Sequence, residues 1–154
     1  MKILVLLISS LIIVLDQLFK FCVANNLKPN GNLTVIEGLL NFTYLENRGA
    51  AFGVLSDQRW FFILTTLLII GFFVYIIFAK PINSKLFCFY AAFIIGGGIG
   101  NLIDRVFLGY VIDYIQLSFF PPVCNFADYC ITAGTILLLI WIIFYYEKDN
   151  KNIG

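Results

Sequence analysis

Four long apolar segments constrain the fold of this chain more than any other feature of its sequence. They cover residues 3–24, 60–79, 86–103 and 126–146. Each is roughly 20 residues long, which at ~1.5 Å rise per residue matches a hydrocarbon core about 30 Å thick. The chain is 61% hydrophobic and only 12% charged, about half the charged fraction of an average soluble domain. We therefore predict an α-helical integral membrane protein in which residues 1–154 form one domain with four transmembrane helices.

An even number of spans places both termini on the same side of the membrane. Lysines gather on that side: Lys2, the ends of the short loop 80–85, Lys148 and Lys151. The other side receives the long loops 25–59 and 104–125, where each cation except Lys28 lies within two residues of an acid. Cytoplasmic loops are short and enriched in Lys and Arg. This pattern predicts cytoplasmic termini and two extracytoplasmic loops.

The first long loop has the pattern of β-structure. Thr34-Val35-Ile36 is β-prone, and residues 40–44 alternate apolar with polar side chains, as half-buried strands do. Residues 48–53 follow as a flexible turn of small residues. We predict a small extracytoplasmic β-sheet that lies on the membrane surface as a platform. An ordinary folded loop is the alternative reading of the same alternation.

Asp113 and Asp128 stand out because no Lys, Arg or His lies within four residues of either. Most other acids have a cation nearby in the sequence: Asp16 has Lys20, Glu46 has Arg48, Asp57 has Arg59, and Asp104 has Arg105. An ionised carboxylate in apolar surroundings is costly and finds a partner or takes up a proton. If Pro121-Pro122 returns the chain so that the two acids meet, they could share a proton and activate water. Helix caps or exposed loop acids are the alternative.

Cysteine and histidine usage excludes several kinds of chemistry. The four cysteines, at positions 22, 88, 124 and 130, show no Cys-x-x-Cys spacing, and there is no histidine for a zinc-protease motif or a Ser–His pair. We therefore expect no metal and no other cofactor. The net charge of +1 without a basic stripe gives no reason to expect a nucleic-acid partner. Carboxylate chemistry is what remains.

The candidate carboxylates lie within a series of five short motifs that covers most of the chain: Asp16-Gln17-x-x-Lys20, Asn47-Arg48-Gly49-Ala50-Ala51-Phe52-Gly53, Gly97-Gly98-x-Gly100-Asn101-Leu102-Ile103-Asp104-Arg105, Val111-x-Asp113-Tyr114-Ile115 and Asn125-Phe126-Ala127-Asp128. In content and order this series resembles lipoprotein signal peptidase, or signal peptidase II, a family of bacterial intramembrane aspartic proteases. There are two small departures from the family's pattern. One is Tyr114, where a Phe is more usual, and the other is Tyr129-Cys130, where small or hydroxyl residues often follow the aspartate.

The resemblance implies a function and a location. It makes Asp113 and Asp128 a catalytic dyad that removes the signal peptide from diacylglyceryl-modified prolipoproteins, cutting just before the lipid-modified cysteine. It implies no metal and no cofactor. The enzyme would lie in the bacterial cytoplasmic (inner) membrane, with its active site near the outer surface. Its partners would be the lipid-modified prolipoprotein and membrane lipids, and we expect a monomer.

The remaining motif residues are candidates for substrate binding or site support: Asp16, Lys20, Asn47, Arg48, Gly49, Asn101, Asp104, Arg105, Asn125 and Ala127. Asp16 and Lys20 lie one helical turn apart and can neutralise each other. Arg48 or Arg105 could hold a lipid phosphate or a substrate carbonyl, although Arg105 could instead pair with Asp104. Structural support and direct substrate contact both remain open for this group.

A small proton- or cation-conducting transporter is the alternative function. Intramembrane acids mark ion paths as well as catalytic sites, and the acids available are Asp16, Asp104, Asp113 and Asp128. All four fall near segment ends on the predicted outer face, with none at mid-depth. Because an ion path needs sites distributed through the bilayer, the sequence favours the peptidase.

Overall fold

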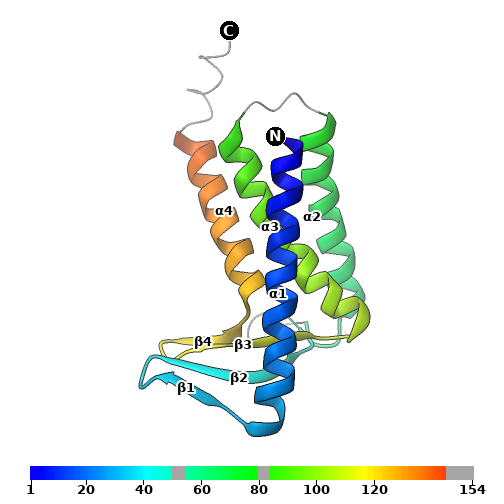
Figure 1. The fold of residues 1–154 in the computed structure, drawn as a ribbon. Helices are drawn as coiled ribbons and strands as arrows, with labels where there is room; N and C mark the ends of the chain where they lie inside the picture. The colour runs from blue at the N-terminus through cyan, green and yellow to red at the C-terminus, as the bar shows by residue number, and fades with distance from the viewer. Residues whose placement is uncertain (50–54, 80–83, 145–154) are drawn as a thin grey trace.

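The computed structural model describes residues 1–49, 55–79 and 84–144. Its helices are α1 (Lys2–Asn30), α2 (Arg59–Ala79), α3 (Lys85–Phe107) and α4 (Phe126–Phe144). All four are long and apolar enough to cross a membrane, which confirms the predicted membrane α-helical class. They stand side by side as a bundle (Figure 1). Residues 145–146 of the fourth predicted span, most of the loop 80–85, and Lys148 and Lys151 lie outside the described residues.

Helix α1 continues beyond the predicted span, which stopped at residue 24. The polar residues that made that boundary extend the helix instead of breaking it, because three asparagine side chains donate to the carbonyl oxygen one turn earlier. The helix ends at Gly31, whose φ of 85° suits glycine and whose N–H donates to the Leu27 carbonyl at 2.8 Å. The last turns of α1 therefore project past the bundle alongside the sheet (Figure 1).

A four-stranded antiparallel sheet crosses this end of the bundle (Figure 1). Its strands, in the spatial order β1-β2-β3-β4, are β1 (Leu33–Ile36), β2 (Leu40–Asn47), β3 (Val111–Leu117) and β4 (Phe120–Cys124). The hairpin of β1 and β2 confirms the sheet predicted in the first loop. The second loop was not expected to join it, because the first four residues of β3 are all buried and so do not alternate. Pro121-Pro122 fits within β4 because β4 is an edge strand, where missing N–H donors are tolerated.

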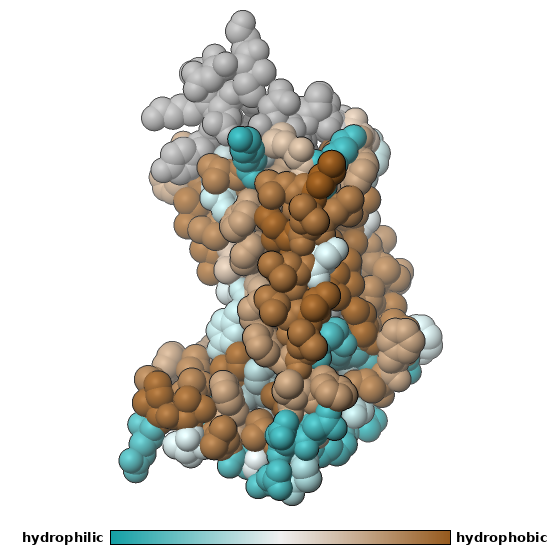
Figure 2. Space-filling model, in the orientation of Figure 1, coloured by the Kyte–Doolittle hydropathy of each residue, from teal (hydrophilic) through white to brown (hydrophobic). Residues whose placement is uncertain are grey.

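Helix α3 is the centre of the bundle. It packs most extensively against α4 and α1, and less against α2. Small residues of α3 such as Ala91 and Ala92 are fully buried and meet Val5 of α1 and Leu138 of α4. Large apolar side chains instead cover the outer surface of the bundle, while polar ones gather at the sheet end (Figure 2). An apolar outer surface of this extent fits contact with lipid.

Two glycines of α3 allow unusually close contact at the sheet end of the bundle. A Cβ atom at Gly100 would lie 2.5 Å from Oδ2 of Asp16 on α1, and one at Gly97 would lie 2.5 Å from the Ala127 carbonyl oxygen on α4. A Cβ at Gly98 would make only an ordinary contact, 3.5 Å from Ile70. Positions 97 and 100 of the glycine-rich motif therefore allow close helix approach, whereas position 98 leaves room for a side chain.

Gly100→Ala should lower the free energy of unfolding by about 1–3 kcal/mol, because the added methyl group overpacks against a buried carboxylate that cannot move away. Gly98→Ala is the matched control and should not lower stability, because a Cβ there makes only ordinary contacts and alanine favours a helix more than glycine does. Unfolding of both variants in mixed micelles checks this. Equal destabilisation by the two substitutions would contradict the packing described for α3.

Candidate active site

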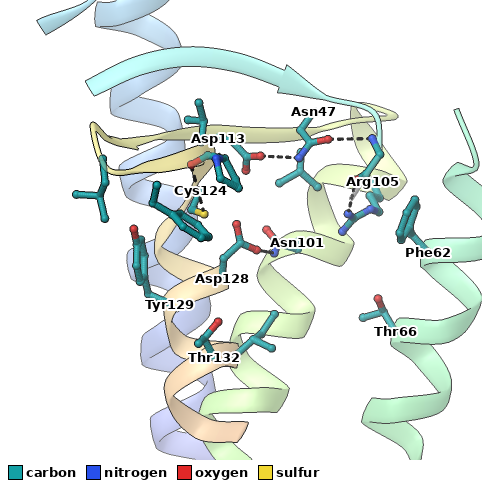
Figure 3. Close-up of a pocket in the computed structure, with 17 residues that line it drawn as sticks. Asn47, Phe62, Thr66, Asn101, Arg105, Asp113, Cys124, Asp128, Tyr129 and Thr132 are labelled. Atoms are coloured by element: carbon teal, nitrogen blue, oxygen red, sulfur yellow. Dashed lines mark hydrogen bonds between the residues drawn. The ribbon is translucent and has the colours of Figure 1, made fainter. Parts of the chain in front are cut away.

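Asp113 and Asp128 line the same cavity, although they come from a strand and a helix. The cavity encloses about 600 Å³ between the sheet and helices α2, α3 and α4. Asp113 reaches it from β3 and Asp128 from the first turn of α4, so that the two side chains face one another from opposite walls (Figure 3). Asp113 is 1% exposed, whereas Asp128 is half-buried.

Asp113 accepts hydrogen bonds from two amide side chains. Its Oδ2 receives Nδ2 of Asn47 at 2.7 Å, and its Oδ1 receives Nδ2 of Asn125 at 2.6 Å. These donors favour the ionised form, but burial, reinforced by the nearby charge of Asp128, outweighs them and raises the pKa of Asp113 to about 7. This carboxyl group can therefore hold a proton close to neutral pH.

Asp128 both faces the cavity and caps its own helix. Its Oδ2 accepts the backbone N–H of Asn125 at 3.1 Å, while Oδ1 of Asn125 accepts the N–H of Asp128 at 2.9 Å. This reciprocal arrangement is a capping box at the start of α4. The other oxygen of Asp128, Oδ1, accepts Nδ2 of Asn101 at 2.8 Å. The sequence left open whether Asp128 caps a helix or belongs to the candidate site, and the structure shows that it does both.

Behind this pair lies a buried ion cluster made by Asp16, Lys20 and Asp104. The ammonium of Lys20 lies 2.8 Å from Oδ2 of Asp16 and 3.0 Å from Oδ2 of Asp104. Oδ1 of Asp16 accepts the N–H of fully buried Ala127 at 3.1 Å, and Oδ2 of Asp104 accepts the N–H of Ile112 at 3.0 Å. The cluster therefore ties α1 and α3 to β3 and to the first turn of α4.

Gln17 belongs to this cluster and was not among the predicted site residues. Its Nε2 donates to Oδ1 of Asp104 at 3.1 Å and to the Gly100 carbonyl at 3.2 Å. Its place beside Asp16 in the first motif was the available signal. An amide with four possible hydrogen bonds in an apolar span needs partners.

The structure gives Asp104 an ion-pair partner other than Arg105, whose pairing with Asp104 was one of the alternatives left open by the sequence. Consecutive residues of a helix point in different directions, so Asp104 turns towards Lys20 while Arg105 turns into the cavity. The Arg105 guanidinium lies 4.8 Å from the ring centroid of Phe62 and donates to the Gly49 carbonyl at 3.4 Å. Sequence proximity also misleads at Glu46, which pairs with Lys28 at 2.9 Å instead of Arg48.

The second motif contributes to the cavity at its start. Asn47 and Gly49 line the cavity, and the Gly49 N–H donates to Oδ1 of Asn47 at 2.9 Å, which directs the Nδ2 of Asn47 towards Asp113 (Figure 3). The Arg48 side chain is exposed and does not line the cavity. Residues 50–53, which complete the motif and the predicted flexible turn, lie outside the described residues.

Much of the cavity wall is apolar and could not be recognised in the sequence. These lining residues come from α2, β4 and α4, and include Phe62, Thr66, Phe120, Cys124, Tyr129, Ile131 and Thr132. In the sequence of a transmembrane helix, side chains of this kind that face a cavity cannot be distinguished from those that face lipid. Within the ranges that the structure describes, no group of three or more His, Cys, Asp or Glu side chains is placed to hold a metal ion.

The chain is similar to known proteins over most of its length. The family model described as signal peptidase (SPase) II matches residues 8–144. A lipoprotein signal peptidase of Caldanaerobacter subterraneus subsp. tengcongensis is 45% identical over 89% of this chain and 94% of its own length, and one from Lactobacillus johnsonii is 43% identical over 94% of each. A bacterial membrane enzyme solved by the in meso method at 2.3 Å resolution superposes with a TM-score of 0.84 and 32% identity, covering 97% of this chain and 91% of that one.

Proposed function

Because the chain belongs to the signal peptidase II family, we propose that it cleaves lipid-modified prolipoproteins with Asp113 and Asp128 as its catalytic dyad. The cut falls immediately before the diacylglyceryl-modified cysteine. The observation that carries this proposal is the pair of carboxylates facing one another across a single cavity at the sheet end of the bundle (Figure 3). The described side chains that hold the two carboxylates all belong to this chain, so the dyad does not need a residue from a second copy.

The dyad performs hydrolysis as a pair that shares one proton. The ionised carboxylate takes a proton from water as the water oxygen attacks the scissile carbonyl carbon. The protonated carboxyl gives its proton to the carbonyl oxygen, and a tetrahedral intermediate forms. When the C–N bond breaks, a proton passes to the leaving nitrogen. The signal peptide leaves with a new carboxylate, and the lipoprotein keeps its cysteine with a free amine.

The shape of the cavity suits a substrate that arrives from the membrane. Thr66 of α2 and Thr132 of α4 lie on opposite sides of the cavity below Asp128 (Figure 3), and the lining between them is mostly apolar. Helix α2 packs mainly against α3, so an apolar peptide and its lipid can reach the dyad from the side between α2 and α4. Arg105, which lines the cavity, is the cation placed to hold a substrate carbonyl.

The arrangement of acids disfavours the transporter alternative. Asp16, Asp104, Asp113 and Asp128 all lie at the sheet end. The half of the bundle away from the sheet, where Ala91 and Ala92 are fully buried, contains a cluster of buried apolar side chains. Of the residues that the structure describes, the spans therefore contribute no acid at mid-depth from which to build an ion path.

A direct assay tests the function. The purified protein should release the signal peptide from a diacylglyceryl-modified prolipoprotein and leave an N-terminal lipid-modified cysteine, as mass spectrometry of both products would show. The unmodified precursor is the matched control and should remain intact.

Cleavage should also persist in EDTA. If EDTA abolished activity and added divalent metal restored it, the dyad mechanism would be overturned. Ion flux into liposomes, without cleavage, would support the transporter instead.

We expect both termini in the cytoplasm and the dyad near the outer surface of the bacterial cytoplasmic membrane. Helix α1 begins and α4 ends at the end of the bundle opposite the sheet (Figure 1). Reporter fusions after Gly154 and within residues 30–32 should therefore report cytoplasmic and external locations, respectively. An external signal from the C-terminal fusion would contradict this topology.

Cleavage should decline as pH rises above about 7, by about tenfold per pH unit. The dyad needs one proton, and a group with a pKa of about 7, as at Asp113, loses it above that pH. Initial rates between pH 5 and 9 (roughly the range where such groups titrate) would measure the decline. Full recovery of rate on return to acidic pH separates titration from denaturation. A rate that stays constant up to pH 9 would argue against a shared proton.

A further inference from the structure

Lys20 reaches the dyad through one intervening side chain. Its ammonium is 2% exposed and has three acceptors, namely the carboxylates of Asp16 and Asp104 and Oδ1 of Asn101 at 2.9 Å. An ammonium has three N–H donors and no acceptor. Three acceptors arranged around it use every donor.

The contact with Lys20 fixes the orientation of the Asn101 amide. Oδ1 of Asn101 accepts from Lys20 and, at 3.1 Å, from Nδ2 of Asn125, so its Nδ2 is directed towards Asp128 at 2.8 Å. A flipped amide would set its NH₂ group against the ammonium and its oxygen against the carboxylate, and both contacts would be repulsive. A cation on the oxygen also polarises the amide and makes its N–H a stronger donor.

Several groups around Asp128 offset the effect of its burial, which disfavours the ionised form. Two of them are cations: Arg105 of α3, which lines the same cavity, and Lys20 of α1, which donates to the Asn101 amide that in turn donates to Asp128. Asp128 also lies in the first turn of α4, where the helix dipole stabilises negative charge. Asp113 faces it from β3, and the uncharged thiol of Cys124 and phenol of Tyr129 complete its titratable surroundings from β4 and α4.

Asp113 differs from Asp128 in its surroundings. It lies on a strand, with no helix terminus beside it, and is almost fully buried. Burial disfavours the ionised form of both carboxylates, and at Asp113 the nearby charge of Asp128 adds to that effect. The two carboxylates are therefore inequivalent before any substrate arrives.

We propose that Lys20 is a positioning residue that holds Asp128 ionised through Asn101, so that Asp128 takes the proton from water and Asp113 donates its proton to the substrate carbonyl oxygen. The proposal rests on the proposed function, and assigns base and acid within it. Lys20 does not line the cavity; it acts by orienting and polarising the Asn101 amide, which lies between Lys20 and Asp128.

The test removes the charge of Lys20 while preserving the fold. Lys20→Gln combined with Asp104→Asn keeps an N–H donor for Asn101 and removes one cation together with one anion, so the net charge of the cluster does not change. The acidic limb of the kcat–pH profile should move to higher pH by about one unit. At pH values below that limb, kcat of the double variant should therefore be about tenfold lower than that of the unmodified protein. Asp104→Asn alone retains the ammonium and should show no such upward shift. An unmoved limb in the folded double variant would overturn the proposal.

A second measurement does not need that variant to fold. Infrared difference spectra with ¹³C-labelled aspartate detect a protonated carboxyl group directly. About one pH unit below the pKa of Asp113, the protonated band of the unmodified protein should vanish in Asp113→Asn and persist in Asp128→Asn. The reverse pattern would overturn the assignment of Asp113 as the acid. If the base and acid assignment fails but the unmodified protein cleaves substrate, the proposed peptidase function still stands. If neither Asp113→Asn nor Asp128→Asn impairs cleavage, the dyad in the proposed function is wrong.

Discussion

Asp113→Asn and Asp128→Asn should each lower the rate of prolipoprotein cleavage by about 10²- to 10⁴-fold. An amide of the same shape can neither take a proton from water nor share one across the cavity. Because the two carboxylates act as one unit, the double variant should be little slower than either single variant. Cleavage of lipidated substrate under single-turnover conditions, normalised to folded protein, measures the effect.

The same chemical change away from the cavity provides the control. Asp57→Asn alters an exposed turn residue whose φ of 65° asparagine also tolerates, and it should leave the rate unchanged. Normalisation to folded protein is needed because Asp128→Asn can also affect folding. Asp128 accepts hydrogen bonds from the Asn101 side chain and from the Asn125 backbone N–H, and the NH₂ group of an asparagine would face one of these two donors. Near-normal turnover in either dyad variant would remove Asp113 and Asp128 from their proposed roles.

Asp16→Ala should lower the free energy of unfolding by about 3 kcal/mol, the lower end of the range for breaking a buried ion pair. Asp16 is fully buried, and its loss leaves the Ala127 N–H without its acceptor. Lys20 would keep Asp104 as a counter-ion, 3.0 Å away, which is why we expect the lower end. Unfolding in mixed micelles, followed by circular dichroism, measures the change.

An exposed ion pair of the same length is the matched control for Asp16. Lys28 and Glu46 lie 2.9 Å apart, but their side chains are 54% and 33% exposed. Solvent screens such pairs and they contribute little, so Glu46→Gln should not measurably change unfolding. If both substitutions had equal effects, burial would not be the reason that the Asp16–Lys20 pair stabilises the fold.

The spans could be predicted from sequence because apolar length is a physical requirement of the bilayer and is written in consecutive residues. The hairpin of β1 and β2 was predictable from alternation. Strands β3 and β4 were not, because Val111 to Tyr114 are buried without alternation and Pro121-Pro122 normally argues against a strand. Their pairing depends on β2 being present beside them, which is information that no local pattern contains.

The candidate dyad was detectable because a carboxylate in apolar sequence needs a physical reason to be there. Partners across the fold were harder to predict: proximity in sequence suggested Arg105 for Asp104, whereas helix geometry gives Lys20. Phe62 and Thr66 could not be distinguished from lipid-facing residues, since the cavity and the bilayer select the same apolar character. Acidic residues in apolar sequence indicated the candidate site, but only the tertiary structure shows which side chains line its cavity.

Asn125 gives the protein a built-in order of maturation. This one side chain hydrogen-bonds Asp113, and it caps the helix that carries Asp128. A nascent chain that ends before Asn125 already contains Asn47, Asn101 and Asp113, yet has neither half of this connection. Because synthesis proceeds from the N-terminus, the proposed dyad is complete only when the last span has been made and its first turn has formed. If the proposed function holds, unfinished copies of the protein cannot cut other chains in the same membrane.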